Sequence, residues 1–210
     1  MRTAIFIACL VCLYPAVPAA ESPPSPFDFK QPWEIIETRE KATLYRHPWP
    51  KGGISTFKVD MEMDASADEL LSIITDVRSY QRWVPYCRKV EILKKTGTGS
   101  FIYYFAMDLP WPASNREWVN KLTVSRNAAD NSIRVSFMAV DYFYPKSNRY
   151  IRVKKHIAHW ILIPISPGRT RSIWQWCTDP GGHLPDWRIE WASRDQVMES
   201  IKKIREILSK

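Results

Sequence analysis

The stretch DPGGHLPDWRIEWASRDQVMESIKKIREIL runs from Asp179 to Leu208, and it decides how the rest of the chain packs. It begins where the last predicted strand ends, and Gly181 and Gly182 allow backbone angles that other residues avoid. Pro185 suits the first turn of a helix. We therefore predict a strand-to-helix hinge, followed by one long helix over 185–208.

This terminal helix is predicted to be amphipathic. Its apolar residues recur at intervals close to three and four, and its basic residues lie largely on the remaining surface. The apolar positions are Trp187, Trp191, Val197, Met198, Ile201, Ile204 and Leu208. A helix with one apolar face needs a surface to pack against, and the preceding chain offers strands.

Six strands are predicted between residue 88 and the hinge, because each segment is rich in β-branched and aromatic residues and ends at a polar turn. The turns are short, which favours antiparallel neighbours. The segments are Arg88–Gly97, Ser100–Leu109, Arg116–Arg126, Ser132–Pro145, Arg149–Ile165 and Thr170–Asp179.

The chain before these strands is predicted as a helix, two strands and a second helix. WEIIETREKA (33–42) is expected to be a short helix, and strands are expected over 43–49 and 54–65. Ser66 and Glu69 have the spacing of a capping box, which predicts that the second helix begins there.

This order of elements predicts the α+β class, since a run of strands is followed by a helix. A sheet of this many strands curls, and the terminal helix can lie against its concave face. Such an arrangement encloses a cavity wherever side chains do not fill the space.

The first residues have the pattern of a secretory signal peptide, with an apolar run over 4–13 after a short basic start. We expect cleavage after Ala19, or after Ala20 as the second choice, and an uncleaved anchor is the alternative. Residues 20–32 are rich in Pro and Ser and are expected to be extended, which leaves 33–210 as the domain. The expected location is the periplasm or the cell exterior.

The composition fits one domain with a packed interior. The 210 residues are 45% hydrophobic, and ten are Trp, a residue with large apolar area and few rotatable bonds. Two interpretations remain open at this point. Either the rings pack a solid core, or they line a cavity.

Lys and Arg outnumber Asp and Glu by 30 to 22, giving a formal net charge of +8. This balance suits an anionic membrane surface, with which we expect transient contact. Nucleic acid fits poorly with an exported chain, and we expect a monomer. Beyond the leader, only Cys87 and Cys177 remain, and the sequence leaves open whether they form a disulfide or stay as free thiols.

Motifs for catalysis are weak. The sequence has no GxSxG, no phosphate-binding glycine loop and no Cys/His spacing for zinc, so no cofactor or metal is expected. His156 and His159 are three apart in a predicted strand and therefore face opposite ways. An acid/base pair of Asp108 or Asp141 with His159 is the one set that an enzyme would use.

Three segments resemble one known family. LPWPASNREWV (109–119), YIRVKKHIAHWILIP (150–164) and DPGGHLPDW (179–187) occur in an order and spacing similar to those of the START family, the StAR-related lipid-transfer domains, and most similar to its bacterial members. The resemblance covers roughly 33–208. It implies a helix-grip fold, in which a curved antiparallel sheet wraps around a C-terminal helix and encloses a tunnel for one lipid.

The resemblance also implies non-covalent binding and transfer of a phospholipid, fatty acyl, sterol or other polycyclic lipid, without catalysis. The gate would be the terminal helix together with the loop RNAADN (126–131). Sterol-binding members carry an internal arginine where this chain has Leu122, and an acid near the position of Tyr103. A sterol held by that ion pair is therefore not expected.

The candidate lipid contacts come from the apolar strands and the terminal helix. They are Tyr103, Phe105, Met107, Phe137, Trp160, Leu162, Trp174, Trp176, Trp191 and Met198. The polar candidates for the tunnel are Tyr104, Asp108, Arg116 and His159, and Arg116 is also expected to pair with an acid. Because the strands are apolar on both faces, the sequence does not decide which face points inward.

Two rivals to a lipid carrier remain. One is an enzyme of the cyclase or hydrolase type on the same scaffold, acting on an apolar substrate. The other is an interaction module of the cell envelope with a solid aromatic core and no continuous cavity.

Overall fold

The computed structural model describes residues 32–47, 56–182 and 186–210, with the side chains of 186–192 left out. The signal peptide that we predict, and most of the extended segment after it, lie outside the described residues. Described strands are β1 (Glu34–Arg39), β2 (Ala42–His47), β3 (Thr56–Met63), β4 (Cys87–Gly97), β5 (Ser100–Met107), β6 (Arg116–Arg126), β7 (Ile133–Ala139), β8 (Ile151–Arg152), β9 (Lys155–Ser166) and β10 (Arg169–Asp179). The helices are α1 (Ala67–Thr75), the 3₁₀ helix η1 (Val77–Arg82) and α2 (Asp186–Leu208).

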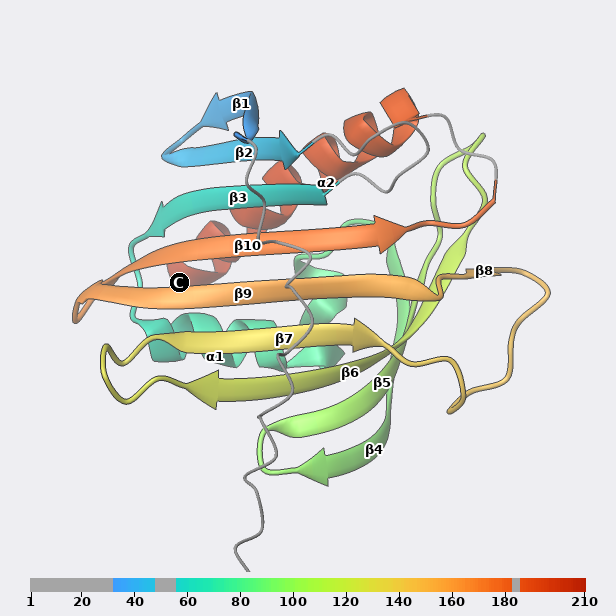
Figure 1. Ribbon diagram of the computed structural model, residues 1–210, viewed down its shortest axis with the longest axis horizontal. Coiled ribbons are helices and arrows are strands. Elements are labelled where there is room, and N and C mark those ends of the chain that lie inside the picture. The colour runs from blue at the N-terminus through green and yellow to red at the C-terminus, as the bar shows by residue number, and fades with distance from the viewer. Residues whose placement is uncertain (1–31, 48–55, 183–185) are drawn as a thin grey trace, which may run out of the picture.

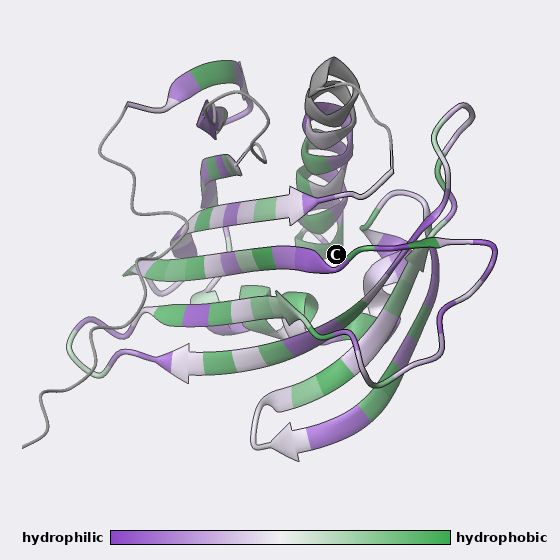
Figure 2. Ribbon diagram, turned by 45° about the vertical axis from the view of Figure 1, so that its right-hand side comes forward, coloured by the Kyte–Doolittle hydropathy of each residue, from purple (hydrophilic) through white to green (hydrophobic). Residues whose placement is uncertain are grey.

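The ten strands form one sheet in the order β1-β2-β3-β10-β9-β7-β6-β5-β4, with β8 paired to β6 at the side of this path. Neighbours are antiparallel except for β8, which runs parallel to β6. The sheet is curved, and α2 lies across its hollow side, where α1 also packs (Figures 1 and 2). The predicted α+β helix-grip architecture is therefore confirmed.

The helix predicted over 33–42 is wrong. This stretch forms β1, a two-residue turn and the start of β2. Glu40 and Lys41 form that turn with φ of 48° and 61°, the backbone that a tight hairpin requires at both central positions. Such turns normally contain Gly or Asn, so the turn had no sequence signal here.

The predicted capping box is confirmed at the start of α1. The backbone N–H of Glu69 donates to Ser66 Oγ at 3.2 Å, and the N–H of Ser66 donates to Glu69 Oε2 at 2.8 Å. The helix then buries Leu70 and Ile74 against the inner side of the sheet. In η1, the buried Tyr80 hydroxyl donates to the carbonyl of Ile74 at 2.9 Å, which ties the two helices together.

Two predicted strands are shorter than expected. The strand predicted over 132–145 ends at Ala139, and the one over 149–165 is split into β8 and β9. The loop between Ala139 and β8 folds over the outer face of β5 and β6, where Phe143 and Tyr144 pack against a small apolar cluster. This loop explains why β5 is apolar on both faces, since both faces are covered.

The two cysteines of the domain are free thiols. Cys87 lies in β4 and Cys177 in β10, which are five strand positions apart in the sheet. That separation is far beyond the reach of a disulfide. Burial raises the pKa of the Cys87 thiol to about 12, so it stays protonated and unreactive.

None of the helices within the described residues is long and apolar enough to cross a membrane. Those residues also contain no group of three or more His, Cys, Asp or Glu side chains placed to hold a metal ion.

Candidate functional site

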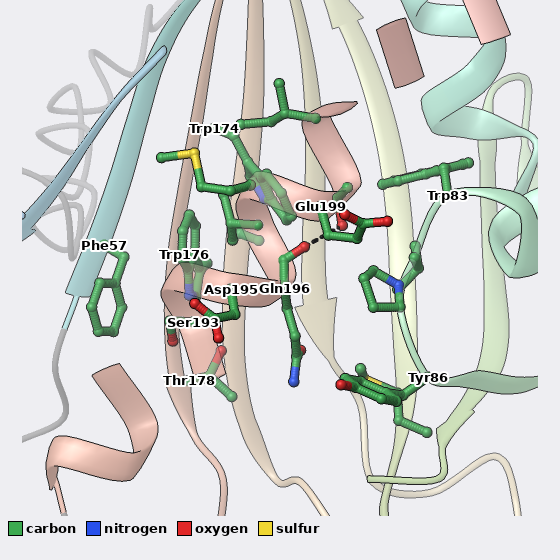
Figure 3. Close-up of a pocket in the computed structure, with 18 of the residues that line it drawn as sticks. Phe57, Trp83, Tyr86, Trp174, Trp176, Thr178, Ser193, Asp195, Gln196 and Glu199 are labelled. Atoms are coloured by element: carbon green, nitrogen blue, oxygen red, sulfur yellow. Dashed lines mark hydrogen bonds between the residues drawn. The ribbon is translucent and has the colours of Figure 1, made fainter. Parts of the chain in front are cut away.

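A cavity of about 930 Å³ lies between the hollow side of the sheet and α2. Its walls come from β3, β5, β6, β7, β9 and β10, from η1 and the residues after it, and from the loop 109–113. Figure 3 shows Gln196 and Glu199 of α2 between the sheet side chains Trp176 and Thr178 and the opposite wall with Trp83 and Tyr86. The volume lies near the upper end of the range for small-molecule sites.

One wall is a continuous layer of aromatic rings from β3, β9 and β10. Trp160 stacks on Trp174 with ring centroids 4.7 Å apart, and Trp174 contacts Trp176 at 5.0 Å. Phe57 then stacks on Trp176 at 5.4 Å. Alternation along the strands places all four rings on one face, so they present a smooth apolar surface to the cavity.

The facing wall is aromatic as well, but it carries polar atoms. Tyr80 contacts Trp83 edge to face at 4.9 Å, and it contacts both Tyr103 and Phe105 at 6.1 Å. Phe105 in turn packs against Trp118 of β6 at 5.2 Å. These rings close the cavity on the side of η1, β5 and β6.

Most of the predicted contact residues lie on the cavity wall. The structure brings together Tyr103, Phe105, Met107, Phe137, Trp160, Trp174, Trp176 and Met198. Leu162 shares the inner face of β9 with Trp160 but is fully buried in the core beyond the cavity. It was predicted to line the cavity, and that prediction is wrong. The side chain of Trp191 lies outside the described residues.

Of the four polar candidates, only Arg116 lines the cavity. Tyr104 lies on the outer face of β5 and donates to Glu117 at 2.9 Å. His159 lies on the outer face of β9, with Nδ1 at 3.0 Å from Ser136 Oγ. Asp108 accepts a hydrogen bond from the Tyr150 hydroxyl at 2.8 Å instead. The expected tunnel positions of Tyr104, Asp108 and His159 are therefore wrong.

The acid/base set predicted for an enzyme is not assembled at the cavity. Asp141 lies in the outer loop, 3.7 Å from Arg152 and 3.8 Å from Lys146. Neither Asp108, Asp141 nor His159 lines the cavity. These three side chains therefore cannot act together on a molecule bound in the cavity.

The predicted opposition of the two histidines is confirmed, and the inward one is His156. It lines the cavity, with Nδ1 at 2.7 Å from Thr178 Oγ1. Burial lowers the pKa of His156 to about 4, so the ring is uncharged at neutral pH. Counting back in steps of two from Trp160 identifies His156 as inward, a signal that the sequence contained.

Arg116 holds the hinge between β10 and α2. Its guanidinium donates to the carbonyls of Pro180 at 3.3 Å and Gly181 at 3.2 Å, and also to the carbonyl of Ser114. The acidic partner expected for it is thus replaced by backbone carbonyls. Gly181 and Gly182 have φ of 65° and 71°, as the hinge prediction requires.

The loop beside the cavity is not the predicted one. Residues 109–113, between β5 and β6, line it, whereas none of 126–131 does. Arg126 pairs with Asp68 of α1 instead, at the far end of β6. Trp111, in the lining loop, is 92% exposed.

Charged side chains gather where α2 meets β1. Arg205 of α2 contacts Glu40 at 3.3 Å, and Arg194 contacts Glu37 at 3.7 Å. These pairs join the helix to the β1–β2 hairpin along one edge of the cavity. They are partly exposed, so they contribute little to stability and can separate without large cost.

The outer face of β6 carries a buried ion pair next to Arg116. Glu117 accepts hydrogen bonds from Arg152 Nε at 3.0 Å, from the Tyr104 hydroxyl at 2.9 Å and from the N–H of Ser147 at 3.1 Å. Arg152 also donates to the carbonyls of Tyr144 and Pro145, which fixes the outer loop. The neighbouring residues Arg116 and Glu117 therefore hold one segment each. Arg116 holds the hinge on the inner face of the sheet, and Glu117 holds the outer loop on the other face.

The family model of the START domain matches residues 30–210. The chain belongs to the START domain family. This family binds and transfers lipids. The rat phosphatidylcholine transfer protein is 24% identical over 176 residues, which cover 81% of this chain and 80% of the rat protein.

Solved structures share the START fold. A STAR-related lipid transfer protein of Xanthomonas axonopodis has a TM-score of 0.76 and 24% identity, over 85% of this chain and 99% of that one. A Streptomyces aromatase/cyclase has a TM-score of 0.52 and 15% identity, over 72% of this chain and 91% of the cyclase. The fold therefore occurs in both a transfer protein and an enzyme, and the residues of the cavity must distinguish them.

Proposed function

We propose that this START domain binds one lipid in the cavity under α2 and carries it between membranes of the cell envelope, without catalysis. The observation that carries the proposal is the cavity itself, with a volume of about 930 Å³ and walls made largely of aromatic rings. Each CH₂ group buried there contributes about 0.8 kcal/mol. An acyl chain therefore supplies ample affinity.

Phospholipids and other acyl lipids are the ligands that the cavity favours. The similarity to phosphatidylcholine transfer proteins supports this class. Leu122 is buried in the core, and Tyr103 lies opposite Asn120 in the β5–β6 register, so these positions form no ion pair for a sterol. Tight binding of an apolar chain requires an opening step for release.

The opening step uses α2 and the loop 109–113. Partly exposed ion pairs hold α2 to the β1–β2 hairpin, and Arg116 holds the backbone of Pro180 and Gly181 that precedes the helix. The ion pairs separate without large cost, so α2 can move as a unit about the glycines. Trp111 projects from the loop at the edge of the cavity and is nearly fully exposed. An exposed indole suits the membrane–water interface, and the net positive charge favours anionic headgroups.

Residues 1–19 are proposed to act as a cleaved signal peptide, which delivers the domain to the periplasm or the cell exterior. The intact mass of the protein recovered from the periplasm of an expressing bacterium tests this. A mass that corresponds to a chain beginning at Ala20 supports the proposal. A full-length chain in the cytoplasm contradicts it.

A transfer assay tests the lipid-carrier function. Donor vesicles carry a fluorescent phosphatidylcholine, acceptor vesicles contain 20% phosphatidylglycerol, and the rate of probe transfer is measured. Ala158→Trp is the blocking variant, because Ala158 is the small residue between Phe137 and Trp176 in the register of the cavity wall. Met138→Trp is the matched control, because Met138 is exposed on the outer face of β7.

The wild type and Met138→Trp are expected to transfer the probe at equal rates, whereas Ala158→Trp is expected to lose transfer with its circular dichroism spectrum unchanged. Equal transfer by Ala158→Trp contradicts a role for the cavity. Turnover of a supplied apolar substrate in place of transfer would favour the enzyme alternative.

A further inference from the structure

Two buried polar atoms on the cavity wall have no hydrogen-bond partner among the described residues. They are Asn120 Oδ1, an acceptor, and Trp83 Nε1, a donor. Both residues line the cavity, and Asn120 is only 3% exposed. A buried polar atom without a partner is rare in native proteins, and it destabilises the fold unless something else completes it.

The amide of Asn120 is held in place from one side. Its Nδ2 donates to the Tyr103 hydroxyl at 3.4 Å, and Tyr103 packs against Tyr80. Tyr80 is itself fixed by its hydrogen bond to the carbonyl of Ile74. This chain of contacts positions the amide and engages one of its two N–H donors, whereas the acceptor Oδ1 has no partner among the described residues.

Asn120 belongs to a polar level between two apolar levels of the wall. It lies opposite Tyr103 in the β5–β6 register. Two positions along β6 in one direction is Trp118, which lines the cavity. Two positions in the other direction is Leu122, which lies in the core but pairs with Phe137 of β7, a lining residue. A ligand that fills the apolar parts of the cavity thus passes this level within its apolar body.

His156 and Thr178 add hydrogen-bonding groups farther along the same inner face, where they pair with each other. The polar side chains of the sheet wall, which are Tyr103, Asn120, His156 and Thr178, are uncharged at neutral pH. Burial raises the pKa of Tyr103 to about 12 and lowers that of His156 to about 4. The charged lining residues lie on α2, on the β1 hairpin and at the hinge. An uncharged ligand group is the complement of the sheet wall.

We propose that Asn120 selects lipids whose apolar body carries an uncharged hydrogen-bond donor, a hydroxyl or an amide N–H, which donates to Asn120 Oδ1. Esters and ethers lack such a donor: their oxygens can accept from Trp83 Nε1, but they leave Asn120 Oδ1 unpaired. The inference rests on the proposed lipid-carrier function, and it narrows the ligand class of the same cavity.

The test compares two probes of equal chain length, 1-hexadecanol and its methyl ether. Both have an oxygen that accepts a hydrogen bond, but only the alcohol donates one. Each competes with a fluorescent fatty acyl probe for the mature protein, and the ratio of the two inhibition constants is measured. Because the ether is the more apolar of the two, any preference for the alcohol reports hydrogen bonding.

The variant is Asn120→Leu, which keeps the side-chain size and removes the acceptor. The matched control is Ser172→Ala, because Ser172 Oγ is also buried and unpartnered but lies away from the cavity. The wild type and the control are expected to prefer the alcohol by about tenfold. Asn120→Leu is expected to bind both probes alike, with a melting temperature no lower than that of the wild type.

Equal binding of both probes by the wild type overturns the inference and leaves lipid binding intact. A preference for the alcohol that survives in Asn120→Leu also overturns it. Failure of the wild type to bind either probe or the fluorescent acyl chain contradicts the inference together with the proposed function. A folded Asn120→Leu that loses only the preference supports the inference.

Discussion

The two faces of β6 treat buried polar groups in opposite ways. On the outer face, Glu117 is fully buried and is matched by Arg152, Tyr104 and a backbone N–H. On the inner face, three residues later, the Asn120 amide is nearly as buried but one of its atoms is unmatched. The outer cluster is complete within the chain, whereas the inner one has an unmatched acceptor, which we propose a ligand completes.

The two kinds of buried polar group therefore have different expected roles: one stabilises the fold, and the other selects the ligand. A satisfied buried network fixes the outer loop and responds strongly to the loss of any member. An unsatisfied group lowers the stability of the empty protein and returns that free energy when a matching ligand binds. Substitutions on the outer face should therefore change stability, and those on the inner face should change ligand choice.

The largest effect is expected from Glu117→Ala. Removal of the carboxylate leaves the Arg152 charge buried without its partner, which should lower the free energy of unfolding by about 3–5 kcal/mol. Urea unfolding measures this. The double variant Glu117→Leu with Arg152→Met should recover most of the loss, because no charge stays buried. A single variant as stable as the wild type contradicts the importance of this pair.

The next effect is expected from Arg116→Met on the inner side. The variant loses charged hydrogen bonds to three carbonyls at the hinge, so stability should fall by about 2 kcal/mol. Release of bound lipid should also become faster, because the glycine hinge before α2 is less firmly held. Stopped-flow measurement of probe release checks this. If Arg116→Met lowers stability but leaves the release rate unchanged, Arg116 stabilises the hinge without controlling lipid release.

A smaller effect concerns the inner and outer histidines. Burial lowers the pKa of both His156 and His159 from 6.5 to about 4. The unfolded chain therefore takes up these protons first as pH falls, and the stability that the two neutral rings contribute above pH 6.5 is lost between pH 6.5 and 4.

His156→Gln and His159→Gln should each reduce this pH dependence, and the double variant should reduce it further. Urea unfolding at pH 7 and pH 5 gives the comparison. An unchanged difference between the two pH values in the double variant contradicts the burial of these rings.

The smallest effect on stability, and of opposite sign, is expected from Asn120→Leu. Removal of an unmatched polar atom should leave the stability of the empty protein unchanged or raise it by about 1 kcal/mol. Thermal unfolding of the delipidated protein measures it. A clear loss of stability would show that Asn120 stabilises the fold, as the outer cluster does, and would contradict a role in ligand choice.

Local signals in the sequence predicted much of this fold. The capping box at Ser66 and Glu69, the glycines of the hinge and the alternation in β5, β9 and β10 all depend on near neighbours in the chain. Eight of the ten candidate lipid contacts, including Trp160, Trp174 and Trp176, lie on the cavity wall, although the sequence did not decide which face of each strand points inward. The resemblance to the START family then connected the strands into one architecture.

The remaining errors come from contacts between distant segments. Tyr104 and His159 were expected inward because their strands are apolar on both faces, and alternation cannot choose between two covered faces. The loop that covers the outer face of β5 had been predicted as strand. Asn120 was missed because its proposed role depends on an acceptor without a hydrogen-bond partner. The absence of a partner can be recognised only once the neighbouring side chains are placed.

Native mass spectrometry of the mature protein, purified from its own host, tests the central claim most directly, when combined with organic extraction of bound material. The account predicts one lipid per chain in the wild type and none in Ala158→Trp. An empty wild-type protein that also takes up no phospholipid, fatty acid or long-chain alcohol would contradict it.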